Sequence, residues 1–210
     1  MARAAKAVTT GATATRFAEA TERAVKADGG ASVLLVDLDD VMTLNQQGGR
    51  ELGDAAIGAA MKVLIATGKL EGWTFGRIGG DEFALLAPGV ALEAAFLRAA
   101  KLREELAAAL RRAVPGRFRA TATIGVANAP RDAKTAEQLM RKADLALYAA
   151  KEQGGNAVGL PPGEDMVLKS SYYSSAQLGR LRALAERAKK KEAVLLREAL
   201  DDLLRKYERA

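Results

Sequence analysis

The chain has 210 residues, 49% of them hydrophobic, which is enough for one domain of ordinary size and a small appendage. It contains no cysteine and no histidine, so thiol nucleophiles, Ser-His pairs, disulfide frameworks and the usual zinc sites are excluded. The net charge of +6 is uneven, because residues 166–210 hold 11 Lys and Arg against 6 Asp and Glu and account for +5 of it.

Helices and strands alternate through the first 160 residues. The pattern predicts, in order, a helix (15–28), a strand buried on both faces (31–39), a turn and helix (45–68), a hairpin (72–78 and 82–88), a helix (91–112), a strand (117–130), a helix (135–153) and a short strand (157–160). This order is typical of an α/β fold in which helices pack on one mixed sheet.

Two prolines and two glycines in "GLPPGED" interrupt both helix and strand, and predict a linker at 160–165. We therefore divide the chain into a domain at 1–159, the linker, and a domain at 166–210. The second domain begins with a short alternating segment and continues with two Leu/Ala-periodic helical stretches. Its excess of positive charge suggests a polyanionic partner.

Chemistry in such a chain must use carboxylates, amines, hydroxyls and bound metal ions. Oxygen ligands favour Mg²⁺ or Mn²⁺. The first residues lack an apolar core of signal-peptide length, and no stretch reaches the ~20 apolar residues of a membrane span. We expect a cytoplasmic protein with no membrane partner.

Acidic residues follow two of the predicted strands. Asp37, Asp39 and Asp40 end the first strand, and Asp81-Glu82 lie in the turn of the hairpin. Neighbouring strands would bring these carboxylates to one edge of the sheet, where a divalent cation relieves their repulsion. In the same turn Gly79-Gly80, which tolerate positive φ, would let backbone amides approach a phosphate.

This combination predicts a metal-dependent nucleotide site. Each motif alone has a simpler interpretation, in which Asp39-Asp40 caps a helix and "GGDE" is an exposed hairpin tip.

Four segments together resemble the GGDEF domain of diguanylate cyclases over Thr10 to Val158. These are "VDLDDVMTLNQQGGRELGD", "GGDEF", "TATIGVA" and "ADLALYAAKEQGGNAV", in the order and spacing of that family. The resemblance implies a nucleotidyl-cyclase, palm-like α/β fold. The implied reaction condenses two GTP molecules into cyclic di-GMP and releases pyrophosphate, with each chain of a homodimer presenting one GTP.

The resemblance also implies roles for individual residues. Asp37 and Asp81 would bind Mg²⁺ or Mn²⁺ with the Leu38 carbonyl, and Glu82 would complete the acidic cluster. The substrate-binding residues would be Asn45 and Asp54 for guanine, Gly79 and Gly80 in the turn, and Lys151 for the phosphates.

Four departures from the family pattern concern phosphate binding and regulation. Met42 replaces a lysine and Gly155 an arginine, while Arg50 replaces a histidine and supplies some positive charge. The product-inhibition motif R-x-x-D falls on Leu70 and Trp73, so we expect no feedback there. We expect a slow cyclase; the alternative is a transcription regulator whose GGDEF domain senses GTP or cyclic di-GMP, and a scaffold with neither activity is a third possibility.

The C-terminal segment "KSSYYSSAQLGRLRALAERAKKKEAVLLREALDDLL" resembles a ribbon-helix-helix DNA-binding domain. That fold pairs one strand from each of two chains into a ribbon that enters the major groove. Alternation would direct Lys169, Ser171 and Tyr173 toward bases, and Ser170 and Tyr172 inward. The simpler alternative is an amphipathic helical pair that dimerises and binds nothing. Either interpretation predicts dimerisation, because so short a piece cannot bury its apolar stripe alone.

Overall fold

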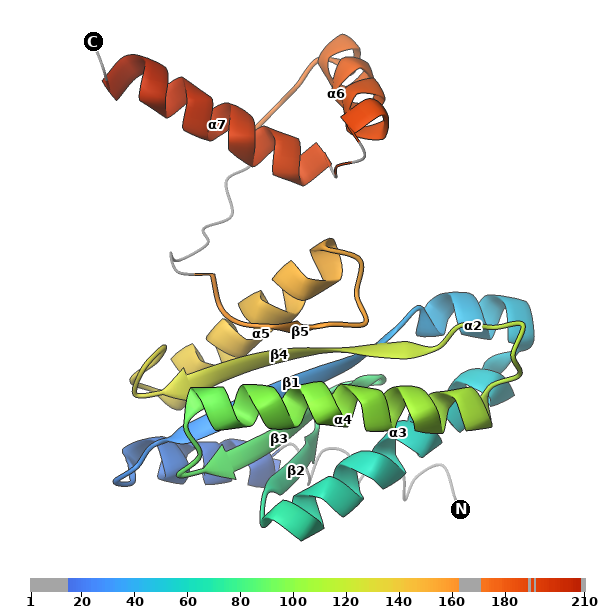
Figure 1. Ribbon diagram of the computed structural model, residues 1–210, viewed down its shortest axis with the longest axis vertical. Coiled ribbons are helices and arrows are strands. Elements are labelled where there is room, and N and C mark those ends of the chain that lie inside the picture. Colours follow the sequence, from blue (N-terminus) through green and yellow to red (C-terminus); the bar gives the residue numbers. More distant parts are fainter. Residues whose placement is uncertain (1–14, 163–170, 189, 191, 209–210) are drawn as a thin grey trace. The chain divides into compact units, whose positions relative to one another are not determined.

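The computed structural model describes residues 15–162, 171–188, 190 and 192–208 (Figure 1). The chain divides into two compact units, Met1–Met166 and Val167–Ala210. Within the described residues, no helix combines the length and the apolar character that crossing a membrane would require.

The first unit is built on a five-stranded sheet with strand order β2-β3-β1-β4-β5. The strands are β1 (Ala31–Asp39), β2 (Thr74–Arg77), β3 (Glu82–Pro88), β4 (Thr121–Ala129) and β5 (Val158–Gly159). Every neighbouring pair is antiparallel except β4 and β5, which are parallel. The mixed sheet predicted from the sequence is therefore confirmed, with β1 at its centre.

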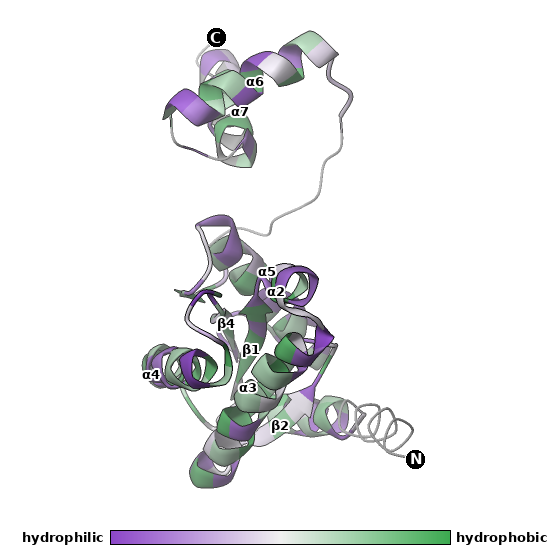
Figure 2. Cartoon of the chain, turned by 90° about the vertical axis from the view of Figure 1, so that its right-hand side faces the viewer, coloured by the Kyte–Doolittle hydropathy of each residue, from purple (hydrophilic) through white to green (hydrophobic). Residues whose placement is uncertain are grey.

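Helices cover both faces of this sheet. Leu34, Val36 and Leu38 of β1 belong to one apolar cluster, together with residues of α3 (Arg50–Glu71) and α4 (Leu92–Ala113). The alternate residues of β1 belong to a second cluster with α5 (Ala136–Glu152) and the helical residues 15–26. Figure 2 shows the apolar strands enclosed between these helices. Burial on both faces explains why β1 reads as one continuous apolar run.

One sequence prediction needs correction after β1. The segment expected to begin as a turn at Asn45 is helical from Val41, and α2 (Val41–Gly48) is a helix separate from α3. The break falls at Gly49, where φ is 84° and the next helix begins. Val41 and Leu44 face the core, so their burial stabilises a short helix that propensity alone does not favour.

The position of α5 is determined at its N-terminus and along its middle. Thr135 caps its N-terminus by accepting a hydrogen bond from the Gln138 amide. Farther along, a Cβ on Gly125 of β4 would lie 2.2 Å from the Ala143 carbonyl oxygen, so only glycine permits this close approach of helix to strand. The C-terminal turn of α5, with Lys151, is thereby held against the sheet.

The second unit contains α6 (Ser175–Ala188) and α7 (Glu192–Glu208). A capping box starts α6: the Gln177 amide donates to the Ser174 hydroxyl, and the Ser174 amide donates to the Gln177 side chain. Of the predicted DNA-contacting residues, Lys169 lies outside the described residues. Ser171 and Tyr173 belong to a described segment, 171–174, that forms no strand within this single chain.

Candidate functional site

The carboxyl end of β1 brings acidic and hydroxyl side chains to one face of the sheet. Asp37 stands opposite Glu82 of β3 and opposite Thr123 of β4. Residues that stand opposite each other in adjacent strands share a face, and here it is the face that α5 covers. Asp37 and Glu82, predicted as catalytic residues from two separate motifs, therefore lie side by side.

Backbone contacts hold the hairpin turn against β1. The Leu38 amide donates to the Asp81 carbonyl at 3.3 Å, so the turn sits directly beside the strand that carries Asp37. Within the turn, the amides of Ile78 and Gly79 both donate to the Glu82 carbonyl. The sequence prediction that joins these two motifs at one edge agrees with this arrangement.

The two glycines of the turn differ from the expectation in one respect. Neither Gly79 nor Gly80 has a positive φ, so turn conformation does not explain them. Arg77, which the sequence analysis did not single out, donates to the carbonyls of Gly79 and Gly80 and fixes the turn. A Cβ on Gly80 would meet no atom within 4 Å, so the backbone there is open to close approach by another group.

Asp37 is the most electrostatically perturbed residue of the site. Burial raises the pKa of its carboxyl above the ordinary value of 3.8, and a hydrogen bond from Lys151 partly offsets this effect. The charges of Asp81 and Glu82 raise the pKa further, which shows that the three carboxylates are near enough to repel. The Lys151 ammonium lies 2.5 Å from Asp37 Oδ1.

A cation already compensates Asp37, and the same carboxylate suits a divalent ion. Among the described residues, no group of three or more acidic side chains forms a complete metal cage. Mg²⁺ commonly needs only one or two protein carboxylates, because waters and substrate phosphates supply the other ligands. Asp37 and Asp81 on adjoining segments fit that requirement.

Asp39 has a structural role that the sequence analysis missed. Its two carboxylate oxygens accept hydrogen bonds from the hydroxyls of Thr121 and Thr123, each at 2.7 Å, and from the Asn156 amide at 3.0 Å. It therefore ties β1 to β4 and to the loop after α5. Asp40 occupies the position before α2, but its side chain makes no capping hydrogen bond, so the simpler capping interpretation is wrong.

The residues predicted to bind guanine lie at the corner between α2 and α3. Asn45 packs against the backbone of Gly53, where an added Cβ would lie 2.0 Å from its Oδ1 atom. Asp54 is the next residue and is exposed, as is Arg50 at the start of α3. Because α2 follows β1 directly, this corner adjoins the edge that carries Asp37.

The loop after α5 explains one departure from the family pattern. Gly155 has φ +69°, and a Cβ there would lie 3.1 Å from the Asp39 carboxylate. Asn156 follows with φ 49° and donates to Asp39 through its amide. An arginine at position 155 would strain this loop, so Lys151 is the cation that α5 contributes to the site.

Comparisons with known proteins agree with the geometry. The chain matches the family described as "Diguanylate cyclase, GGDEF domain" over residues 12–157. It is 35% identical over 144 residues to the bifunctional diguanylate cyclase/cyclic di-GMP phosphodiesterase MucR of Pseudomonas aeruginosa, covering 67% of this chain and 20% of that protein. It is 36% identical over 129 residues to the probable diguanylate cyclase DgcC of Escherichia coli, covering 60% of this chain and 33% of that protein.

A solved structure also resembles this chain. A sensory box/GGDEF family protein from Caulobacter crescentus superposes with a TM-score of 0.56 at 36% identity, covering 68% of this chain and 91% of that one. The chain thus spans a fifth to a third of the two relatives above, but most of a solved GGDEF domain. The similarity ends before the C-terminal unit, since the family match stops at residue 157. The chain belongs to the diguanylate cyclase GGDEF domain family.

Proposed function

We propose that this protein is a diguanylate cyclase, which joins two GTP molecules into cyclic di-GMP and releases two pyrophosphates. The observation that carries the proposal is the meeting of Asp37, Asp81 and Glu82 at one sheet edge, with Lys151 beside them. Membership of the GGDEF family supports the same reaction.

Each residue has a defined task in this reaction. Asp37 and Asp81 would hold Mg²⁺ or Mn²⁺, which supplies a Lewis acid that acidifies the attacking 3′-hydroxyl and neutralises charge on the phosphate. The Lys151 ammonium, which lies beside Asp37, would contact the substrate phosphates. The Asp54 carboxylate accepts hydrogen bonds from the N1-H and amino groups of guanine, a pairing that adenine cannot make, and Asn45 adds a further hydrogen bond.

Two chains must meet for turnover. The 3′-hydroxyl of the GTP on one chain attacks the α-phosphorus of the GTP on the other, and pyrophosphate leaves with the electron pair of the broken bond. Repeating the attack in the opposite sense closes the ring. The exposed positions of Asp54 and Arg50 keep this edge of the domain accessible to a second copy.

The rate should be low for the family. Met42, at the position of a family lysine, is 72% exposed and contributes no charge. Gly155 stands at the position of a family arginine, and an arginine placed there would strain the backbone. Each missing cation removes a charge-assisted hydrogen bond of about 1.5–3 kcal/mol to the phosphates.

The decisive test is mass analysis of products from purified protein and GTP, with Mg²⁺, with Mn²⁺ and with EDTA. We expect cyclic di-GMP and pyrophosphate with metal and neither with EDTA. An Asn45→Ala variant should raise KM more than it lowers kcat, because its amide contacts the base. A folded dimer that binds GTP but releases no pyrophosphate with either metal contradicts the cyclase proposal and supports a sensor of GTP or cyclic di-GMP.

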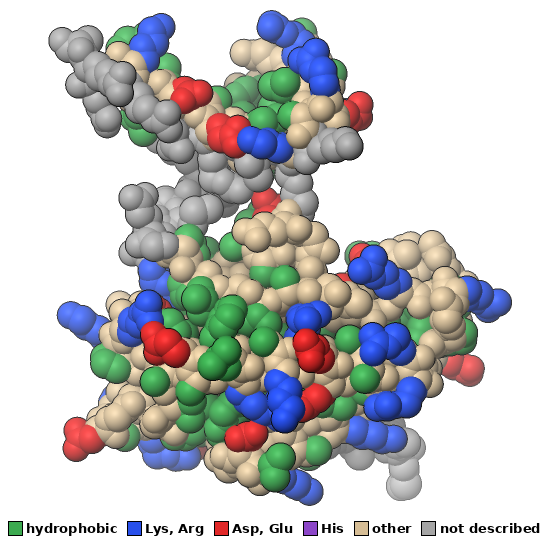
Figure 3. Space-filling model, viewed as in Figure 1, with side chains coloured by type: hydrophobic (Ala, Val, Ile, Leu, Met, Phe, Trp, Pro, Cys, Tyr) green, Lys and Arg blue, Asp and Glu red, His purple; other side chains and the backbone are tan. Residues whose placement is uncertain are grey.

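We further propose that the second unit dimerises the chain and binds DNA as a ribbon-helix-helix domain. Leucines along α6 and α7 remain exposed, including Leu200 at 54% and Leu203 at 51%, and Figure 3 shows hydrophobic side chains uncovered on both helices. A second copy would cover them. The missing strand partner for 171–174 would come from the same copy, and Lys169, Ser171 and Tyr173 would then face the bases.

Two measurements test this proposal. Sedimentation of the full chain should give a dimer, and Leu200→Glu should weaken it. DNA affinity should fall steeply with salt, since lysines and arginines displace counterions from phosphates. A Lys169→Ala/Tyr173→Ala variant should remain dimeric and lose DNA affinity; an unchanged affinity, or a flat salt response, contradicts the DNA-binding proposal while leaving the cyclase proposal intact.

A further inference from the structure

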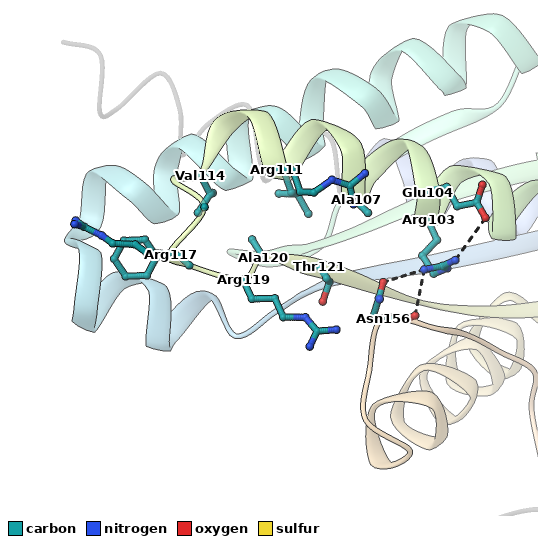
Figure 4. Close-up of a pocket in the computed structure, with 13 residues that line it drawn as sticks. Arg103, Glu104, Ala107, Arg111, Val114, Arg117, Arg119, Ala120, Thr121 and Asn156 are labelled. Atoms are coloured by element: carbon teal, nitrogen blue, oxygen red, sulfur yellow. Dashed lines mark hydrogen bonds and ion pairs between the residues drawn. The ribbon is translucent and has the colours of Figure 1, made fainter.

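A cavity of about 620 Å³ lies between the C-terminal half of α4, the chain at 114–120 and the start of β4 (Figure 4). It is lined by none of the residues assigned above to metal, guanine or phosphate. Its volume is in the usual range for small-molecule sites, roughly 300–1,000 Å³. The size therefore suits a nucleotide rather than a single inorganic ion.

The lining of this cavity is strongly basic. Four arginines, Arg103, Arg111, Arg117 and Arg119, stand against one acid, Glu104, which gives a net charge of +3. Arg111 and Arg119 make no ion pair or hydrogen bond within the described part of the chain. Guanidinium groups pair with phosphate oxygens in a bidentate geometry, and a concave site concentrates their field.

The same cavity has an apolar wall. Ala107, Leu110 and Val114 contribute buried side chains, and the partly buried ring of Phe118 lies under the Arg117 guanidinium at 5.0 Å. A wall of this kind with a few converging charged groups is typical of sites for organic ligands. The chemistry fits a molecule with an apolar or aromatic body and at least one phosphate.

Helix electrostatics explains part of the arrangement but not all of it. Cations are favoured at a helix C-terminus, and Arg111 and Arg112 lie in the last turn of α4. Arg103 lies two turns earlier, and Arg119 comes from the chain entering β4, where no helix dipole attracts it. Figure 4 shows Arg103, Arg111 and Arg119 around the cavity from these different segments.

The cavity also contacts the loop between α5 and β5 through Asn156. Arg103 donates to the Asn156 side chain at 3.0 Å, and the Asn156 amide donates to Asp39. A phosphate that recruits Arg103 would compete with Asn156 for its guanidinium. The cavity and the acidic edge thus share one residue.

We propose that this cavity is a second site, which binds a nucleotide-sized organic phosphate through Arg103, Arg111 and Arg119. Binding of the phosphate in this cavity requires neither metal nor turnover, so it is independent of the cyclase reaction. Three probes distinguish the sources of the phosphate: GMP as a mononucleotide, cyclic di-GMP as a dinucleotide, and guanosine as the body without phosphate.

Calorimetric titration of the full chain in EDTA tests the proposal. We expect GMP or cyclic di-GMP to bind and guanosine to be at least about tenfold weaker, because charged contacts to phosphate dominate. Binding of cyclic di-GMP alone makes the ligand a dinucleotide, and binding of GMP alone makes it a mononucleotide.

Matched variants locate the binding. Arg111→Gln/Arg119→Gln should weaken binding by about tenfold or more, whereas Arg112→Gln/Arg131→Gln, which removes the same charge outside the cavity, should stay within about twofold. All four side chains are exposed, so the melting temperature of each variant checks folding. The proposal is overturned if neither phosphate probe binds, or if Asn45→Ala abolishes binding while the cavity variant retains it.

Discussion

The two units of the chain differ in how they treat apolar side chains. In the first unit, Leu34 and Phe83 of the sheet are 0% exposed, and helices cover both faces. In the second, Ala185 alone is buried among the described side chains, and Leu200 and Leu203 are about half exposed. The first unit completes its core within one chain, whereas the second leaves an apolar stripe exposed in the single chain. Under the dimer proposal, folding and association therefore belong to different segments.

Loss of one carboxylate in the first unit should lower the rate of catalysis and leave dimerisation through the second unit unchanged. If Asp81 holds the metal ion as proposed, Asp81→Asn should reduce kcat by about 100-fold or more, because that ion would stabilise the transition state. Sedimentation should still give the wild-type dimer, which separates catalysis from assembly. Steady-state rates with Mg²⁺ and with Mn²⁺ provide the measurement, and a variant with the wild-type rate refutes the metal assignment.

A pair of leucine substitutions compares the two units directly. Leu34→Ala should lower the free energy of unfolding of the first unit by about 3–5 kcal/mol, since it opens a cavity in a closed core. Leu200→Ala should leave that free energy unchanged and weaken the dimer instead. Trp73, the one tryptophan of the chain, reports unfolding of the first unit by fluorescence in denaturant. Equal losses from both substitutions would show that the units unfold together.

Inside the first unit, Asp39 and Asp40 offer a charge-matched test of structural roles. Asp39→Asn should cost about 1–3 kcal/mol, because an amide nitrogen replaces one acceptor oxygen. The chain then loses the hydrogen bond from Thr123, or those from Thr121 and the Asn156 amide. Asp40→Asn should stay within about 0.5 kcal/mol, since Asp40 is exposed and asparagine tolerates its left-handed backbone. Denaturant titration measures both; similar costs would remove the distinction between them.

The smallest expected effect concerns pH and Asp37. The pKa of Asp37 is raised above 3.8 in the folded chain, so the folded chain binds a proton at this carboxyl more readily than the unfolded chain does. At neutral pH the carboxyl is charged in both states, and its charge lowers the stability of the folded chain. Without metal, Asp37→Asn should be at least as stable as the wild type at pH 7. As the pH falls through the raised pKa toward 3.8, the free energy of unfolding of the wild type should rise relative to that of the variant. A stability difference that does not change with pH contradicts this account.

Much of the fold could be predicted because local pattern and burial agree. The apolar run at 31–39 coincides with β1, and the two short apolar segments on either side of the "GGDE" turn predict the hairpin. The break between α2 and α3 was missed, because Gly48-Gly49 interrupts a pattern that otherwise continues as one helix. The bonds of Asp39 to Thr121 and Thr123 depend on how β1 pairs with a strand more than 80 residues later, which no local pattern specifies.

In the candidate site, too, local motifs could be predicted from the sequence and tertiary contacts could not. The acidic motifs can be recognised from the sequence alone. Their position at one edge of the sheet follows once the strands that carry them are taken as neighbours. Arg77, Arg103 and Asn156 are ordinary polar residues in sequence and gain a role only through tertiary contacts. Residues 171–174 form no strand in the single chain, and the ribbon proposed through Tyr173 would need a second chain.

The central place of β1 makes its length a fixed dimension of the domain. It pairs along its length with neighbours on both sides. Asp37 lies two positions after Leu35 and four after Val33, so it shares their face of the strand and faces the site. Insertion of one residue would turn Leu38 toward the substrate and bury the carboxylate among leucines. Natural variants of this domain should accordingly hardly ever differ in length within β1.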